Sequence, residues 1–159
     1  MLTLRPAVPA DAETLERFVR ELAEYEREPD AVVTDAAAIR AQLEADRPPF
    51  EAMVAELDGT PVGFALWFRN YSTWLGRPGL YLEDLYVTPA ARGKGVGKAL
   101  LKRLARIAVD SGCGRFEWSV LDWNTPAIEF YRALGAEPMD GWTVHRVTGE
   151  ALSRLADGG

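Results

Sequence analysis

Two adjacent carboxylates, Glu83 and Asp84, interrupt the otherwise apolar and aromatic run Leu80–Val87. A carboxylate in such a place can accept a proton or pair with a cation. The run predicts a buried strand, because Pro89 follows it and proline cannot donate to a strand ladder. We therefore expect Glu83 to lie in an apolar setting. Successive strand residues point to opposite faces, so Glu83 and Asp84 should do so unless a β-bulge re-aims Asp84.

A glycine-rich loop, Arg92–Gly97, follows this strand and opens an amphipathic helix. Glycine lets the backbone approach an anion closely, and the positive end of the helix dipole favours one. The loop does not fit the nucleotide-binding P-loop, because Arg92 and Ala99 stand where Gly and Ser or Thr are required. Lys98 likewise breaks the dinucleotide fingerprint. The loop thus indicates a different anion site, or a plain glycine-rich connection between strand and helix.

The length of 159 residues and 48% hydrophobic content predict a single globular domain, residues 1–159. The net charge of −6 disfavours nucleic acid as a partner and suits a cationic substrate. The single cysteine excludes an intrachain disulfide and is typical of a reducing compartment. No apolar run reaches the length of a membrane span, and no His/Cys/Asp cluster has metal spacing. We expect a cytoplasmic protein without membrane or metal.

The hydrophobic periodicity predicts elements that would position these residues. In chain order the expected elements are a strand Leu2–Pro6, helices at 11–26 and 34–43, strands Phe50–Leu57 and Pro61–Phe68, a loop Asn70–Gly79, the strand Leu80–Val87, a helix from about 97 to 112, a strand Phe116–Leu121, a helix Ala127–Leu134, a strand Trp142–Thr148 and a helix Gly149–Leu155. Asp58-Gly59 is a strong signal for a hairpin between the second and third strands. The order predicts a mixed α/β fold with helices on both faces of a central sheet.

The pattern Arg92-x-x-Gly95-x-Gly97, between a strand and a helix, resembles the pyrophosphate loop of the GCN5-related N-acetyltransferases. The element order is similar over nearly the whole chain. This resemblance implies a mostly antiparallel sheet and acetyl-CoA as co-substrate. The cofactor contacts that it implies come from Leu85, Tyr86, Val87, Arg92, Gly93, Lys94, Gly95, Val96, Gly97, Lys98, Asn124, Ala127 and Tyr131.

A second set of motifs resembles the diamine acetyltransferases of the spermidine/spermine type and the related thialysine acetyltransferases. The matching stretches are Leu22–Glu26, Tyr81-Leu-Glu-Asp84, Trp123-Asn124, Phe130-Tyr131, Leu134-Gly-Ala136 and Gly141-Trp142. The resemblance implies that Glu83 is the general base, that Tyr131 is the general acid, and that the protein is a homodimer with substrate sites near the interface. The cationic amine would be bound by Tyr25, Glu26, Trp74, Glu83, Asp84 and Trp142. The loop Tyr71–Trp74 departs from the polyamine enzymes because it lacks acid, so a shorter diamine or a lysine analogue such as thialysine becomes comparably plausible.

These roles make chemical sense, because an amine must be neutral to attack a thioester. With an amine pKa near 10.4, only roughly 0.04% is free base at pH 7, so a carboxylate must accept the proton. Other interpretations remain open: Tyr131 could be a packed core residue, Asn124 a simple helix cap, and Trp74 a loop anchor. The acceptor could also be a protein N-terminus, a lysine side chain or an aminoglycoside. A non-catalytic acyl-CoA sensor is the alternative from another class.

Overall fold

Within residues 1–158, which the computed structural model describes, five strands form one sheet in the order β1-β2-β3-β4-β5. The strands are β1 Leu2–Pro6, β2 Glu51–Leu57, β3 Thr60–Ser72, β4 Arg77–Val87 and β5 Arg115–Trp118. The first four pair antiparallel, and β4 pairs with β5 in parallel. The expected mixed, mostly antiparallel sheet is confirmed.

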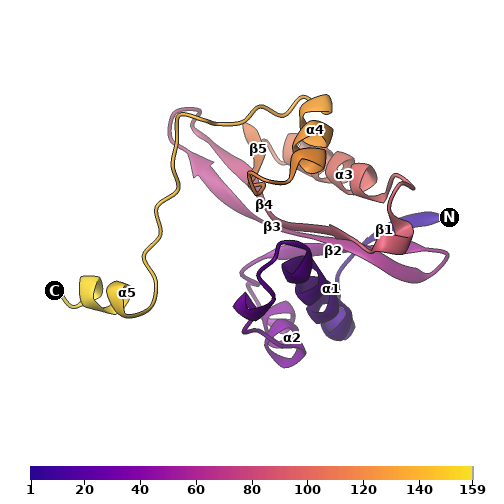
Figure 1. Cartoon of the computed structure of the whole chain (residues 1–159), viewed down its shortest axis with the longest axis horizontal. Coiled ribbons are helices and arrows are strands. Elements are labelled where there is room, and N and C mark those ends of the chain that lie inside the picture. The colour runs from indigo at the N-terminus through magenta and orange to yellow at the C-terminus, as the bar shows by residue number, and fades with distance from the viewer. Residues whose placement is uncertain (159) are drawn as a thin grey trace. The chain divides into compact units, whose positions relative to one another are not determined.

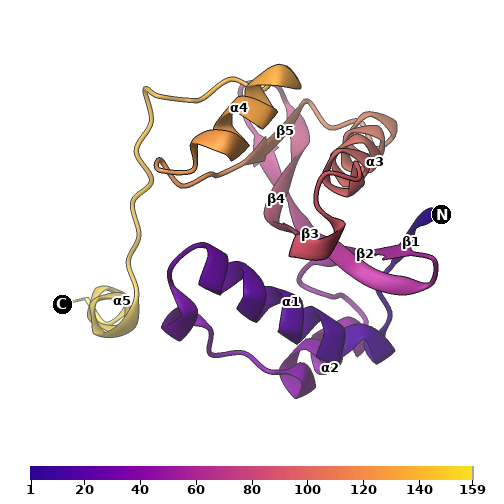
Figure 2. The same ribbon diagram turned by 45° about the vertical axis from the view of Figure 1, so that its right-hand side comes forward.

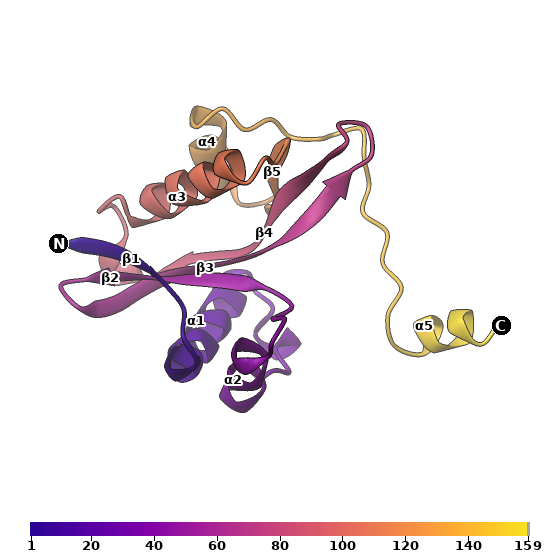
Figure 3. The same ribbon diagram turned by 180° about the vertical axis from the view of Figure 1, so that it is seen from behind.

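The α-helices are α1 Ala12–Tyr25, α2 Ala36–Glu44, α3 Val96–Asp110, α4 Thr125–Ala133 and α5 Gly149–Ala156. Short 3-10 turns lie at Pro9–Asp11, Pro29–Ala31 and Pro89–Ala91. The chain divides into two compact units, Met1–Leu121 and Asp122–Gly159. In the first unit α1 and α2 cover one face of the sheet and α3 covers the other (Figures 1 and 3). No helix within residues 1–158 has both the length and the apolar character of a membrane span.

The core on the α1 face forms because apolar residues recur at helical spacing along α1 and meet alternate strand residues. Phe18 of α1 stacks on Phe64 of β3 at a ring-centroid distance of 5.9 Å and lies 5.8 Å from the ring of Tyr86 on β4. Val54 of β2 joins the same buried cluster. Side chains at neighbouring positions of β2 and β3, such as Met53 and Trp67, therefore face α3.

Local capping and turn signals explain where two of these elements begin. Asp35 is the N-cap of α2, and its Oδ1 accepts a hydrogen bond from the Ala38 amide at 2.8 Å. Asp58 and Gly59, at φ 49° and 83°, form the expected hairpin turn. Asp11 precedes α1 as expected but does not cap it through its side chain. Its carboxylate instead accepts hydrogen bonds from both terminal nitrogens of Arg5, at 2.8 and 2.9 Å, and from the Val8 amide.

Two expected elements are wrong. The predicted loop Asn70–Gly79 is mostly strand, because β3 continues to Ser72 and β4 starts at Arg77, which leaves only a short turn. The predicted last strand, Trp142–Thr148, is not a strand in the second unit. A strand requires a neighbour for its backbone groups, and no strand pairs with this segment within residues 1–158. β5 is also shorter than the predicted Phe116–Leu121.

Candidate functional site

A β-bulge in β4 places the two adjacent carboxylates. Leu66 of β3 lies opposite Asp84, while the next residue, Trp67, lies opposite Leu82. Glu83 is therefore the extra residue of β4, without a partner in the register. The bulge reverses the alternation of side chains, so Leu82 faces α3 with Trp67 whereas Asp84 faces α1. The bulge that the sequence allowed as an exception is thus present.

The bulge brings Asp84 beside Glu83 and beside Glu26, which caps the C-terminus of α1. Burial, followed by the charges of Glu83 and Glu26, raises the pKa of Asp84 from 3.8 to about 6. Partial burial and the charge of Glu83 also raise the pKa of Glu26. The negative end of the α1 dipole adds to the same field. We call Glu26, Glu83 and Asp84 the acid cluster, and a cation placed among them would relieve their mutual repulsion.

The two carboxylates of β4 differ in exposure in a way that the sequence did not indicate. Glu83 is exposed, whereas Asp84 is partly buried. The expected apolar setting of Glu83 is therefore wrong, because the bulge pushes this residue out of the packed strand. Glu83 can reach solvent and a bound molecule, while Asp84 forms the less hydrated wall of the cluster.

The edge of β4 next to the acid cluster is open. The ladder between β4 and β5 covers only Gly79–Leu82, although β4 continues to Val87. No strand within the described residues pairs with Leu85, Tyr86 and Val87 on that side. The Thr88 amide donates to Val62 of β3, so the carbonyl on the same planar peptide, that of Val87, points towards the open edge. Such an edge can pair with an extended ligand as a strand would.

The glycine-rich loop joins β4 to α3, which lies across the sheet from α1 (Figure 2). Gly93 and Gly95 have φ of 78° and 81°, a region that favours glycine. Gly95 is the N-cap of α3, and the helix begins at Val96. The first amides of this 15-residue helix have no acceptor within the helix, and they lie at the positive end of its dipole. The loop and these amides therefore fit the diphosphate of a nucleotide cofactor, which residues 93–98 would hold.

Arg92 connects this loop to the end of α1. Its Nε donates to the Val87 carbonyl at 3.1 Å, and its guanidinium lies 5.3 Å from the ring centre of Tyr25 and 5.8 Å from that of Tyr86. These cation–π contacts place the cation on aromatic faces. The sequence marked Arg92 and Tyr25 as separate site residues but gave no sign that they touch.

Glu21 is a residue of this region that the sequence interpretation missed. It accepts a hydrogen bond from the Tyr86 hydroxyl at 3.4 Å. Burial and the neighbouring Glu21 raise the pKa of Tyr86. The helical spacing of Glu21 and Tyr25, four residues apart on α1, was a usable signal because such residues share a helix face.

The structure does not bring Trp74 to the acid cluster within one chain. Trp74 lies in the turn between β3 and β4 and is 87% exposed. Ser72, at the end of β3, is six positions beyond Leu66, the partner of Asp84. At ~3.4 Å per residue this is roughly 20 Å of strand. A role for Trp74 at the cluster would therefore require a second chain.

The remaining predicted site residues belong to the second unit. Asn124 is buried and precedes α4, where its side chain makes no cap hydrogen bond. Ala127 and the partly buried Tyr131 lie on α4 itself. Trp142 is 70% exposed, in the segment between α4 and α5. Their predicted roles remain predictions.

Comparison with known proteins identifies the family. The model of the acetyltransferase (GNAT) family matches residues 14–136. The chain belongs to this family. A thialysine N-ε-acetyltransferase from Sus scrofa is 41% identical over 164 residues, which cover 96% of each protein. A spermidine/spermine N(1)-acetyltransferase-like protein from Homo sapiens is 34% identical over 96% of this chain and 23% of its own length.

Among solved structures, an integron cassette protein from the mobile metagenome of V. cholerae superposes with a TM-score of 0.81. It is 25% identical, and the match covers 98% of this acetyltransferase and 97% of the other chain. Among residues 1–158 no group of three or more His, Cys, Asp or Glu has the arrangement of a metal site.

Proposed function

We propose that this GNAT protein transfers an acetyl group from acetyl-CoA to a primary amine of a small cationic substrate, such as thialysine or a short diamine. The observation that carries the proposal is the acid cluster, two of whose carboxylates lie on β4 beside the open edge of the same strand. The relatives named as thialysine and spermidine/spermine acetyltransferases support the same class of acceptor.

On the donor side, acetyl-CoA supplies a thioester carbonyl whose C–S bond breaks when an unprotonated amine attacks it. The open edge at Leu85–Val87 would pair with the pantetheine arm, and residues 93–98 with the diphosphate. Asn124 and Ala127, at the start of α4, are proposed to complete the contacts to that arm.

On the acceptor side, the ammonium proton must leave before attack. We assign its removal to Glu83, directly or through a water, because its carboxylate is accessible. Asp84 and Glu26 would pair with the cationic substrate, and Tyr25 would offer an aromatic face to its charge. Tyr131 would then donate a proton to the departing CoA sulfur, so that amide and thiol are the products of direct transfer.

The preference for a short substrate rests on where the negative charge lies. The acid cluster provides three carboxylates at one end of α1. The turn containing Trp74 adds no acid between Tyr71 and Trp74 that could bind the far end of a long polyamine. A substrate with two positive charges close together therefore suits the described residues better than spermine does.

We further propose a homodimer. The second unit displays apolar side chains along the segment 137–156, including Trp142, Val144, Leu152 and Leu155, which are all more than half exposed. Several exposed large apolar side chains on one segment are a candidate for an interaction site. A second chain could also bring Trp74 to an acid cluster that is too distant within one chain. Sedimentation equilibrium should give the mass of a dimer, and a monomer at all concentrations would refute this part.

The function is tested by measuring CoA release with thialysine, lysine, putrescine, spermidine, spermine and a peptide amine. We expect the small amines to be acetylated, with thialysine or putrescine preferred over spermine. Turnover on the peptide alone, or on none of the amines, would refute the proposal. Glu83→Gln should shift the pH–rate profile to more alkaline values, where more amine is free base, and an unshifted profile would remove Glu83 from proton transfer.

A further inference from the structure

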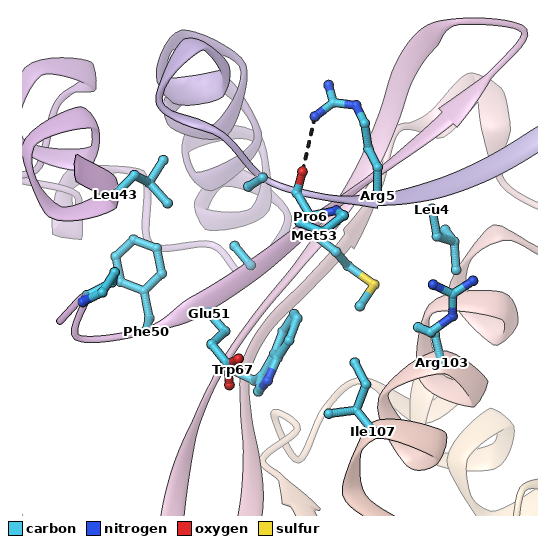
Figure 4. A pocket seen from close by; sticks show the side chains of 13 residues that line it. Leu4, Arg5, Pro6, Leu43, Phe50, Glu51, Met53, Trp67, Arg103 and Ile107 are labelled. Carbon is cyan, nitrogen blue, oxygen red and sulfur yellow. Dashed lines mark hydrogen bonds between the residues drawn. The ribbon is translucent and has the colours of Figure 1, made fainter. Parts of the chain in front are cut away.

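A cavity of about 380 Å³ lies beside β1 and β2, bordered by α3 and by Leu43 of α2. Figure 4 shows Arg103 and Ile107 of α3 on one side of it and Phe50 on the other, with Met53 and Trp67 between them. None of the residues of the acid cluster, of the open edge Leu85–Val87 or of the glycine-rich loop lines this cavity. The proposed acetyl transfer therefore makes no use of it.

The walls of the cavity are mainly apolar. Leu4 of β1, Met53 of β2 and Ile107 of α3 contribute aliphatic surface, while Phe50 and Trp67 contribute aromatic rings. Sites for small ligands have volumes of about 300–1,000 Å³ and walls of this kind, with a few polar groups that fix orientation. The volume lies near the lower end of that range, which suits a small molecule with an apolar body.

Most charged groups around the cavity are already paired. The Arg5 guanidinium binds Asp11 at 2.8 Å and Glu56 at 2.9 Å. Glu51 lies 4.0 Å from Arg69. The two carboxylates outweigh the charge of Arg5, and Arg69 matches Glu51, so none of these groups attracts an anion.

Arg103 differs from these groups. It lines the cavity, it is exposed, and no carboxylate within the described part of the chain forms an ion pair with it. A planar guanidinium binds a carboxylate through two parallel hydrogen bonds. Arg103 is therefore the lining side chain that can attract an anionic group.

Trp67 supplies a second unsatisfied group. Its side chain is almost completely buried, and its indole Nε1 has no hydrogen-bond partner among residues 1–158. A buried donor without an acceptor is costly, so native structures rarely keep one. An acceptor atom entering beside this ring would relieve that cost, which a purely apolar ligand could not do.

We infer that this cavity binds a small amphipathic monocarboxylate. Its apolar body would lie between Met53 and Ile107, and its carboxylate would pair with Arg103 and accept a hydrogen bond from Trp67 Nε1. The site is distinct from the acetyl-CoA and amine sites, so its occupancy does not depend on acetyl transfer.

The inference is tested by calorimetric titration of the full chain with octanoate, 1-octanol and acetate. These probes offer the apolar body with the charge, the body alone and the charge alone. We expect saturable binding of octanoate, weaker binding of octanol and no detectable binding of acetate. The indole ¹H–¹⁵N resonance of Trp67, assigned by its loss in Trp67→Phe, should shift with octanoate. Absence of saturable octanoate binding, or an unmoved Trp67 resonance, would overturn the inference.

Two charge variants on the same helix sharpen the test. Arg103→Gln should weaken octanoate binding about fivefold, as expected for loss of one accessible ion pair. Arg106→Gln is the matched control, because Arg106 is exposed, pairs with Asp110 and does not line the cavity. Ile107→Trp should abolish binding by filling the cavity, with thermal unfolding to check its fold. Equal weakening by the two arginine variants would show binding to the general charge of α3 and would refute the site.

Discussion

Asp84 is expected to make the protein less stable at the pH at which the enzyme would work. Replacement by Asn keeps the shape of the side chain and removes its charge. Burial and the charges of Glu83 and Glu26 raise the pKa of Asp84 from 3.8 to about 6, a difference of about two units. At ~1.4 kcal/mol per unit this corresponds to at most about 3 kcal/mol, and solvent screening of a partly buried group reduces it.

The sign follows from proton linkage. The folded state binds this proton more tightly than the unfolded state, so the favourable contribution is present below pH 3.8 and is lost as the pH rises through about 6. Asp84→Asn should therefore match the wild type near pH 4 and exceed it by about 1–3 kcal/mol in free energy of unfolding at pH 8. Urea denaturation at several pH values between 4 and 8 measures this difference.

The exposed Asp30, on the 3-10 turn after α1, gives a matched control. Asp30→Asn removes the same charge outside the acid cluster and should give no rise between pH 4 and 8. Putrescine or thialysine should stabilise the wild type at pH 8 by binding the folded state, and should stabilise Asp84→Asn less. A pH-independent difference, or a variant less stable than the wild type at pH 8, would show that Asp84 is not held in an electrostatically unfavourable place.

Three further predictions, one of them with a matched control, test separate parts of the structure. Tyr131→Phe should lower kcat with little change in acetyl-CoA affinity, because only the proton donor is lost; an unchanged kcat would remove Tyr131 from the chemistry. Gly95→Ala should lower the free energy of unfolding by about 1 kcal/mol, because alanine is strained at the positive φ of this position, and calorimetry should show weaker binding of acetyl-CoA. Gly76→Ala, at φ 64° in the β3–β4 turn, is the control: it should lower the free energy of unfolding by a similar amount without changing that affinity. Asp11→Asn should lower the free energy of unfolding by about 2 kcal/mol at pH 7, because it removes a partner of Arg5. Arg5 lowers the pKa of Asp11, so this loss of stability should shrink as the pH falls below 3.8. A loss of the same size in urea denaturation at acid pH would contradict this prediction.

The parts of the fold that the sequence predicts well are those with a local physical cause. Asp58-Gly59 defines a hairpin because two consecutive positive φ angles require such residues. The glycine-rich loop marks the start of α3, because Gly95 is well suited to the left-handed N-cap position. The amphipathic spacing of Leu100 and Leu104 identifies the buried face of that helix. Each signal lies within a few residues of the feature it predicts.

The parts that could not be predicted depend on partners distant in sequence. The position of the bulge is decided by how Leu66 and Trp67 pair with β4, and Glu83 alone does not reveal it. The segment Trp142–Thr148 has strand-like composition, yet a strand forms only where another edge accepts its hydrogen bonds. The contact of Arg92 with Tyr25 joins residues 67 positions apart, and neither residue type specifies the other.

The bulge and Arg92 together would let one strand serve both proposed substrates. Without the extra residue at Glu83, Asp84 would face α3, and no carboxylate of β4 would join Glu26 at the end of α1. Arg92 lies five residues beyond the end of the same strand and brings a permanent positive charge close to this acidic region. Its guanidinium rests on the rings of Tyr25 and Tyr86 and its Nε bonds to a carbonyl, so its charge is balanced by π faces and a dipole. The carboxylates of the acid cluster thereby remain available for an external ammonium group, which is the condition that an amine acetyltransferase with a cationic substrate must meet.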